Sequence, residues 1–275
     1  MTDCNHDCAS CASKKDGSCN GEKPGFAAPA NARSHVARVI AVMSGKGGVG
    51  KSLVTELLAV QAQKRGLRVA VLDADITGPL IPTAFGVKDR AMSDGEGILP
   101  CRSENGIALM SLNFLVENPA DPVVWRGPVL AGAVKQFWSD VAWGDVDVMF
   151  VDLPPGTGDV PLTVFQSLPV TGAVVVTSPQ DLVSLIVEKA VRMAGMMEVP
   201  VLGLVENMSV FRCPDCGAEH HIFGPSRVGE LAARHGIAAI ASLPIDPEYA
   251  KAVDLGAVER LDAPSLDAIL DAVLA

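Results

Sequence analysis

The sequence of 275 residues lacks any uncharged apolar run of about 18 residues, which a membrane-spanning helix needs. It also lacks a basic surplus, because 32 Asp and Glu against 22 Lys and Arg give a formal charge of −10. A membrane span is therefore excluded, and a nucleic-acid partner is not expected. The first residues have neither the basic nor the apolar region of a secretory signal. Seven clustered cysteines are too few for a disulfide scaffold, so we expect metal ligands in a reducing cytoplasm.

Residues 1–35 contain no Val, Leu or Ile and cannot bury a core of their own. Four of the seven cysteines lie in this segment, namely Cys4, Cys8, Cys11 and Cys19. Four thiolates within sixteen residues suit one iron–sulfur cluster or one zinc ion, and inert cysteines are the alternative. We therefore predict a flexible cysteine-bearing extension over residues 1–35, followed by one domain over residues 36–275.

From residue 36 onward, short β-branched runs alternate with longer helical patterns. The expected strands are apolar without polar alternation, which is typical of a mostly parallel sheet covered by helices on both faces. They cover residues 38–43, 69–73, 107–112, 146–152, 173–177, 201–207 and 238–243. The expected helices cover residues 50–65, 181–197, 227–235 and 264–274, and residues 95–110 form an antiparallel excursion. The predicted class is α/β.

The segment from Gly45 to Ser52 matches the P-loop pattern G-x-x-x-x-G-K-[ST] between a strand and a helix. Its glycines let backbone N–H groups wrap around phosphate at the helix N-terminus. Lys51 is expected to reach the β- and γ-phosphates, and Ser52 to ligate Mg²⁺. The predicted cofactor-binding residues of the loop are Gly45, Lys46, Gly47, Gly48, Val49, Gly50, Lys51 and Ser52.

A second apolar strand ends in Asp152 and a glycine-rich turn, where an acid would hold the water shell of Mg²⁺. In that turn the N–H of Gly156 is placed to sense the γ-phosphate, and the loop is expected to move on hydrolysis. Asp73 and Asp75 follow another strand. Two roles remain open for Asp73, which could cap the end of the strand or make a contact behind the phosphate site.

Cys213 and Cys216 have C-x₂-C spacing, which lets both thiolates reach one metal. One such pair supplies half of a ligand set, so two chains on a two-fold axis would supply the four ligands of a [4Fe–4S] cluster. Structural zinc, a redox pair and inert thiols are the alternatives. Cys101 stands alone and is expected to be structural.

Lys46, directly after the first glycine of the loop, resembles the signature lysine of the deviant Walker A ATPases, such as MinD, ParA and the nitrogenase iron protein. Within that group the chain is most similar to the Mrp/ApbC-type iron–sulfur cluster carriers over residues 38–260. The shared motifs are Ser44–Ser52, Asp73–Pro79, Asp152–Asp159, Glu206–Ser209, Cys213–Gly217 and Pro244–Pro247.

This resemblance implies a homodimeric, slow, Mg²⁺-dependent ATPase that takes [4Fe–4S] clusters from donors and passes them to apo-proteins. It implies that Lys46 reaches the nucleotide of the facing subunit and that Asp75 positions the attacking water. Asn207 would contact adenine, and Asp246 would lie in the loop that closes over the base. The sequence departs from the family pattern at two places. The spacing of the N-terminal cysteines differs from that of the eukaryotic scaffold branch, and Pro161 stands where the family usually has Gln.

Three other functions compete with this one. A positioning ATPase of the MinD or ParA kind needs a basic membrane helix or a basic DNA-binding surface, and residues 263–275 contain no Lys or Arg. A nucleotide-gated electron donor like the nitrogenase iron protein bridges its cluster with cysteines far apart in sequence. The third alternative is a scaffold whose ATP site is only structural.

Overall fold

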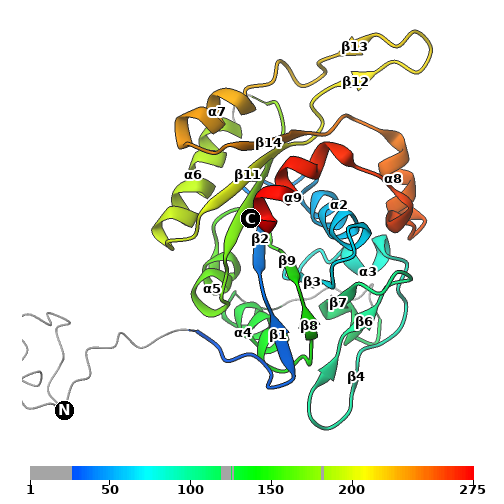
Figure 1. The fold of residues 1–275 in the computed structure, drawn as a ribbon, viewed down its shortest axis with the longest axis vertical. Helices are drawn as coiled ribbons and strands as arrows, with labels where there is room; N and C mark the ends of the chain where they lie inside the picture. Colours follow the sequence, from blue (N-terminus) through cyan, green and yellow to red (C-terminus); the bar gives the residue numbers. More distant parts are fainter. Residues whose placement is uncertain (1–26, 119–124, 126, 181–182) are drawn as a thin grey trace, which may run out of the picture.

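The computed structural model describes residues 27–118, 125, 127–180 and 183–275. Within these residues the central sheet has eight strands in the order β14-β11-β10-β2-β9-β3-β7-β6, and β6 alone runs antiparallel to its neighbour (Figure 1). The strands are β2 (Val39–Ser44), β3 (Val69–Asp73), β6 (Cys101–Arg102), β7 (Ala108–Met110), β9 (Val148–Asp152), β10 (Gly172–Thr177), β11 (Val201–Glu206) and β14 (Ala239–Ser242). The predicted α/β class with a mostly parallel sheet is confirmed.

Helices cover both faces of this sheet, and each face has its own core. Strand β2 shows the division, because Val39, Ala41 and Met43 face one core while Ile40 and Val42 face the other. The first core packs against α4 (Gly127–Ser139), α5 (Asp159–Ser167), α6 (Val183–Met196) and α7 (Val228–His235). The second packs against α2 (Lys51–Lys64), α3 (Ile81–Ala84), α8 (Pro247–Asp254) and α9 (Asp267–Leu274). Burial on both faces explains why the strands lack polar alternation.

The antiparallel excursion expected over residues 95–110 is present. Strand β6 pairs with β7, and β4 (Met92–Ser93) pairs with β5 (Ile98–Leu99) in a separate antiparallel hairpin. Helices α3, α4, α5 and α8 were not among the expected elements. The helix expected over residues 264–274 is divided into a 3₁₀ turn (Pro264–Leu266) and α9.

Residues 28–36 pack against the body of the protein. β1 (Ser34–Val36) pairs in parallel with β8 (Gly144–Val146). The backbone N–H of Ala28 donates to the carbonyl of Ser167 (2.8 Å), and its carbonyl accepts a bond from Trp138 Nε1 (3.0 Å). The boundary predicted between residues 35 and 36 therefore falls inside β1, and the packed part of the chain begins upstream of it.

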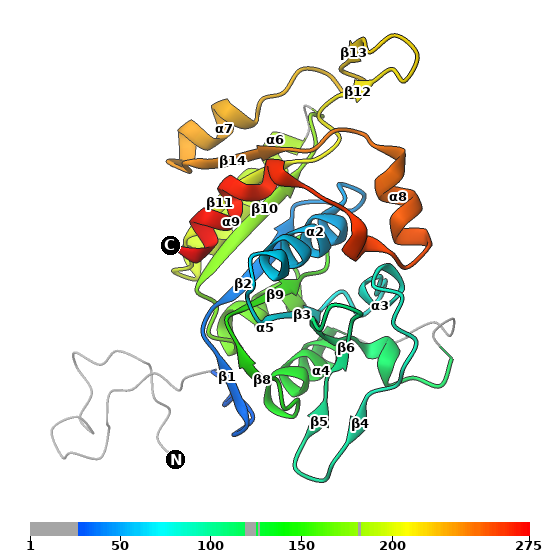
Figure 2. The ribbon, with the colours of Figure 1, turned by 45° about the vertical axis from the view of Figure 1, so that its right-hand side comes forward.

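A two-stranded hairpin of β12 (Phe211–Arg212) and β13 (Glu219–His220) projects from the carboxyl edge of the sheet, where β11 ends. β1 lies at the opposite end of the molecule in two views (Figures 1 and 2). The topology explains this, because β1 leads into the start of β2, whereas the hairpin follows the end of β11. No helix among the described residues is long and apolar enough to cross a membrane.

Candidate functional site

The loop between β2 and α2 forms an open cradle at a helix N-terminus. Gly48 and Gly50 both have φ of +79°, a conformation that strains any residue with a side chain. A Cβ at Gly48 would meet nothing within 4 Å, whereas one at Gly50 would collide with the amide of Asn207. Glycine is thus required at Gly50 for conformation and for space. The loop lines a cavity of about 400 Å³ at the start of α2, a geometry suited to an anion.

Lys51 lines this cavity and pairs with Asp152, which does not line it. The side chain of Lys51 is only 6% exposed and that of Asp152 only 1% exposed, and Lys51 Nζ lies 2.7 Å from Asp152 Oδ1. Asp152 also accepts bonds from Ser52 Oγ (2.6 Å) and Thr55 Oγ1 (2.8 Å). The desolvation cost of burying this charged pair is offset by the hydrogen bonds that the two hydroxyl groups donate to Asp152. The structure therefore brings together the predicted phosphate lysine and both predicted Mg²⁺ ligands.

Two further carboxylates follow β3. Asp73 accepts bonds from Ser111 Oγ (3.1 Å) and from the backbone N–H of Asp75 (3.2 Å), so it fixes the loop after β3. Asp75 is more open, with 15% of its side chain exposed, and its Oδ2 lies 3.9 Å from Lys51 Nζ. Burial raises the pKa of Asp75, while Lys51 acts in the lowering direction. Of the two, Asp75 is the carboxylate that lines the cavity.

Glu56 lines the same cavity from α2 and was not predicted. Burial raises its pKa well above the usual value, and the charges of Asp152 and Asp73 act in the same direction. Its Oε2 atom has no hydrogen-bond partner among the described residues. In the sequence it is the only acidic residue of α2, and only its position four residues after Ser52 relates it to the loop.

Lys46 also lines the cavity and donates from its side chain to Gln180 Oε1 of the same chain. Its own carbonyl accepts a bond from Ser44 Oγ (3.0 Å), and the carbonyl of Ser44 accepts one from the N–H of Gly156 (2.9 Å). The N–H that was expected to sense a γ-phosphate is thus engaged by the P-loop strand. Gln180 was not predicted, although a polar residue shortly after β10 lies at the ligand-binding edge of the sheet.

A second cavity of about 420 Å³ adjoins the first, because Leu53, Met208 and Val253 line both. Asn207 and Asp246, the two residues that the resemblance places at the base, both line this cavity, which is called the base pocket below. Asn207 is buried and donates from Nδ2 to the carbonyl of Val49 (3.0 Å), while Asp246 caps α8 by accepting from the N–H of Glu248 (2.9 Å). Met208 and Tyr249 also line this cavity and were not predicted, because an apolar or aromatic residue carries no motif signal.

The predicted cysteine pair lies in the loop of the β12–β13 hairpin. Cys213 N–H donates to the carbonyl of Ala218, and Gly217 N–H donates to that of Cys213 (both 2.9 Å). Hydrogen bonds from the backbone N–H groups of Cys216 and Asp215, together with the Cys216 thiol, lower the pKa of Cys213. Cys216 is exposed, whereas Cys101 is buried.

The described residues contain no group of three or more His, Cys, Asp and Glu side chains that could hold a metal ion. Within one chain, Cys213 and Cys216 therefore have no third His, Cys, Asp or Glu ligand beside them among the described residues. The other predicted set, Cys4, Cys8, Cys11 and Cys19, lies outside the described residues.

Comparison with known proteins places this site in a family. Residues 35–273 match a ParA-type family model described as NUBPL iron-transfer P-loop NTPase. The chain is 42% identical over 268 residues to the iron-sulfur cluster carrier protein of Clostridium perfringens, covering 92% of this chain and 93% of the relative. It is also 42% identical over 263 residues to the iron-sulfur cluster carrier protein of Methanocaldococcus jannaschii, covering 93% and 90%.

Solved structures agree with this placement. The nucleotide-binding protein of Archaeoglobus fulgidus in complex with ADP is 44% identical, with a TM-score of 0.76 and coverage of 84% of this chain and 91% of that chain. The cell division ATPase MinD of Pyrococcus furiosus is 20% identical with a TM-score of 0.58, covering 86% and 97%, and shows a shared fold only.

Proposed function

Because the chain belongs to the NUBPL family of iron-transfer P-loop NTPases, we propose that it is an ATP-hydrolysing carrier that binds [4Fe–4S] clusters and passes them to apo-proteins. The observation that carries this proposal is the combination of two sites on one sheet edge. A P-loop with a buried Lys51–Asp152 pair lies beside a projecting hairpin with two cysteines. Relatives named as iron–sulfur cluster carriers, similar over nine tenths of the chain, support the assignment.

The donor atoms at the start of α2 fit ATP and Mg²⁺. Ser52 Oγ and the Asp152 carboxylate converge within 2.6 Å, and oxygen ligands of this kind suit Mg²⁺. Bound Mg²⁺ would supply charge neutralisation at the phosphates. Lys51 would then exchange Asp152 for phosphate oxygens, and Asp75 would orient the attacking water. Lys46 would leave Gln180 and reach the nucleotide of a second subunit, so turnover is slow without a productive dimer.

The cluster is cargo in this proposal. Cys213 and Cys216 of two chains together supply four thiolates, which matches the ligand number of one [4Fe–4S] cluster. The lowered pKa of Cys213 favours the thiolate form that binds iron. Cys4, Cys8, Cys11 and Cys19 are proposed to hold a second cluster. The expected partners are another copy of this chain, cluster donors and apo iron–sulfur proteins, in the cytoplasm.

The decisive assay is cluster transfer. Anaerobically reconstituted protein is incubated with an apo-protein that has a vacant [4Fe–4S] site, and recovery of the acceptor's activity is followed with a chelator present. We expect transfer from the wild-type protein and loss of transfer in a Cys213→Ala, Cys216→Ala double variant that still binds ATP. Undiminished transfer from the double variant would refute the role of the hairpin, and ATP turnover without any transfer would favour a positioning ATPase.

A further inference from the structure

The segment Asn207–Phe211, here called the hairpin root, is shared by the base pocket and the cysteine hairpin. Asn207 bonds to the carbonyl of Val49 in the P-loop (3.0 Å), and Met208 lines both the phosphate cavity and the base pocket. Strand β12 begins at Phe211, three residues after Met208. Only residues 209–212 separate Met208 in the pocket wall from Cys213. A displacement of Met208 is therefore expected to displace the cysteines as well.

A second part of the base-pocket lining, the segment around Ile245, also holds the hairpin root. Ile245, which lines the pocket beside Asp246, donates its N–H to the carbonyl of Val210 (2.8 Å) and forms an isolated parallel bridge with Phe211. Ser209 donates both its N–H and its hydroxyl to the carbonyl of Leu243 (2.9 Å each). Closing or opening the pocket around a base would thus move the hairpin root from both sides.

The returning strand of the hairpin rests on the same segment. Nδ1 of His221, the residue after β13, lies 3.3 Å from the carbonyl oxygen of Ser209. A carbonyl oxygen only accepts, so the ring nitrogen donates in this contact. Both ends of the hairpin are therefore attached to residues next to Met208, and the hairpin is held to move with its root.

Met208 itself has a strained backbone, with φ of +59°. The bonds on either side hold it there, because Asn207 N–H donates to Thr177 (2.8 Å) and Ser209 N–H donates to Leu243 (2.9 Å). A residue kept in this region by its surroundings has few alternative conformations. Movement of Asn207 is therefore passed on to Ser209 instead of being absorbed between them.

We propose that the hairpin root couples occupation of the base pocket to the position of Cys213 and Cys216, so that these cysteines respond to the adenosine part of the nucleotide. The inference rests on the proposed function, which supplies the nucleotide and the cargo. It differs from coupling through residues 152–159, because that loop would respond to the γ-phosphate. Adenosine diphosphate fills the base pocket without a γ-phosphate, whereas inorganic tripolyphosphate fills the cradle without a base.

The test measures alkylation rates of Cys213 and Cys216 in full-length, cluster-free protein by peptide-resolved mass spectrometry. Rates are compared without ligand, with saturating ADP and with saturating tripolyphosphate, whose binding is checked by competition with ATP. We expect ADP to change the rates by at least about fivefold, the lower end of usual coupling between two sites, and tripolyphosphate to leave them unchanged. The proposal is overturned if ADP has no effect or if tripolyphosphate reproduces it.

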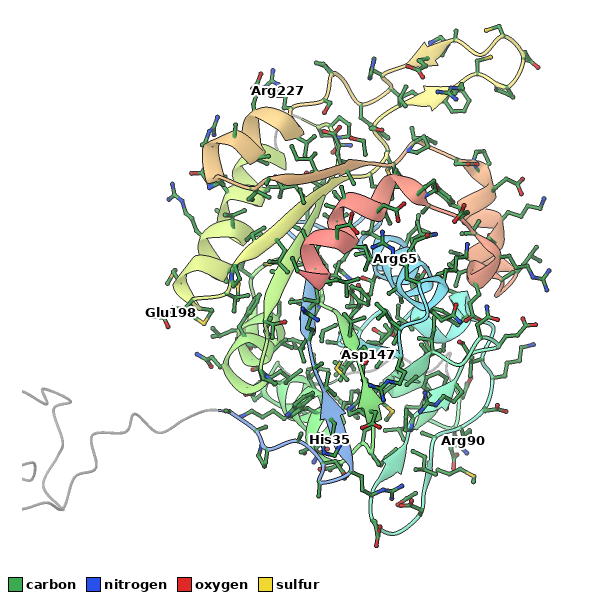
Figure 3. All side chains as sticks on the ribbon, viewed as in Figure 1. His35, Arg65, Arg90, Asp147, Glu198 and Arg227 are labelled. Atoms are coloured by element: carbon green, nitrogen blue, oxygen red, sulfur yellow. The ribbon has the colours of Figure 1, made fainter. Side chains whose placement is uncertain are left out.

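Variants locate the coupling in the hairpin root. Met208→Gly relaxes the strained link and should remove the ADP effect at saturating ADP. Glu198→Gly is the matched control, because Glu198 has φ of +60° but lies beyond α6, far from the hairpin (Figure 3). If Met208→Gly loses ADP affinity altogether, His221→Ala decides, since the His221 side chain is exposed, hydrogen-bonds to the hairpin root and lines neither the phosphate cavity nor the base pocket.

His221→Ala should keep ADP affinity and lose most of the ADP effect on the alkylation rates. Full coupling in that variant would overturn the proposal. Failure of the coupling is distinguishable from failure of the carrier function, because a carrier without this coupling still transfers clusters to an apo-protein. A protein that never transfers clusters fails the proposed function whatever its alkylation rates show.

Discussion

Lys46 and Lys51 are five residues apart but have different partners. Lys51 is buried against Asp152, whereas Lys46 bonds to Gln180, which does not line the cavity. We expect Lys51→Ala to weaken Mg·ATP binding by about 10- to 100-fold, since a charge-assisted hydrogen bond is lost. Lys46→Ala should keep binding and lower turnover by about 10³-fold, as for a charge supplied in trans. Isothermal titration and phosphate release measure the two effects.

Lys88→Ala is the control for this pair, because Lys88 is exposed and lies outside the nucleotide cavity. It should change neither binding nor turnover. Equal losses of binding in Lys46→Ala and Lys51→Ala would contradict the different roles of the two lysines.

Cys213 gives a prediction for pH dependence. Bonds to the Cys213 sulfur lower its pKa, so the thiolate forms at lower pH than in a free cysteine. The alkylation rate of Cys213 should therefore rise with pH and reach half of its maximum below the midpoint of a free cysteine. Cys216→Ser should raise that midpoint only part of the way toward the midpoint of a free cysteine, because the backbone N–H donors of residues 215 and 216 remain. A wild-type midpoint at or above that of free cysteine would contradict the bonding seen in the hairpin.

Residues within motifs were predictable because the chain supplies them consecutively. Gly45 to Ser52 and the Cys213–Cys216 pair could be identified without the fold. Gln180, Met208 and Tyr249 were missed because three separate segments bring them to the site, namely the turns after β10 and β11 and helix α8. Their contribution depends on which strands are neighbours, and one sequence does not show this.

At the scale of elements, α3 and α8 meet through two glycines. Gly86 has φ of +65°, and a Cβ there would lie 2.6 Å from the carbonyl oxygen of Gly256. Gly86→Ala should lower the free energy of unfolding by about 2–4 kcal/mol, combining backbone strain with overpacking. Gly66→Ala is the control, because Gly66 has φ of +83° with nothing within 4 Å, and strain alone costs about 1 kcal/mol. Urea denaturation measures both, and equal losses would show that the close contact contributes nothing.

The expected and missed helices differ in their sequence signals. Helix α2 has a P-loop before it and an apolar run inside it, so it was predicted. Helix α4 begins with Gly-Pro and contains Gly132, and α5 has Pro161 in its first turn, which the helix tolerates only there. Helix α8 does have a helix-start signal in the sequence, Asp246 as N-cap followed by Pro247, although it was not among the expected helices.

The packed residues upstream of β2 give a prediction for truncation. Deleting residues 1–26 should leave stability and ATP binding unchanged and remove part of the bound iron. Deleting residues 1–36 should also lower stability, because β1 and the bonds of Ala28 to Ser167 and Trp138 are lost at about 1 kcal/mol for each hydrogen bond. Thermal unfolding and iron analysis distinguish the two. Identical stability would show that residues 27–36 contribute no packing.

At the scale of the whole molecule, the parallel sheet separates two regions of the chain. Its carboxyl edge carries the P-loop, the base pocket and the cysteine hairpin, while β1 enters at the opposite edge (Figure 1). The two cavities and the hairpin cysteines thus share one edge, and residues 28–36 pack away from it. The alternation of strands and helices predicted the mostly parallel sheet, whereas the pairing of two chains depends on a second molecule.

The most direct test of the central claim counts iron at the hairpin. Wild-type protein and the Cys213→Ala, Cys216→Ala double variant are reconstituted anaerobically, and iron, sulfide and native mass are measured for both. One [4Fe–4S] cluster shared by two chains predicts that the dimeric wild-type protein carries about two more iron atoms per chain than the variant. A difference of about four iron atoms per chain would mean one cluster per subunit, and no difference would mean that the hairpin holds no cluster; either result would contradict a shared cluster.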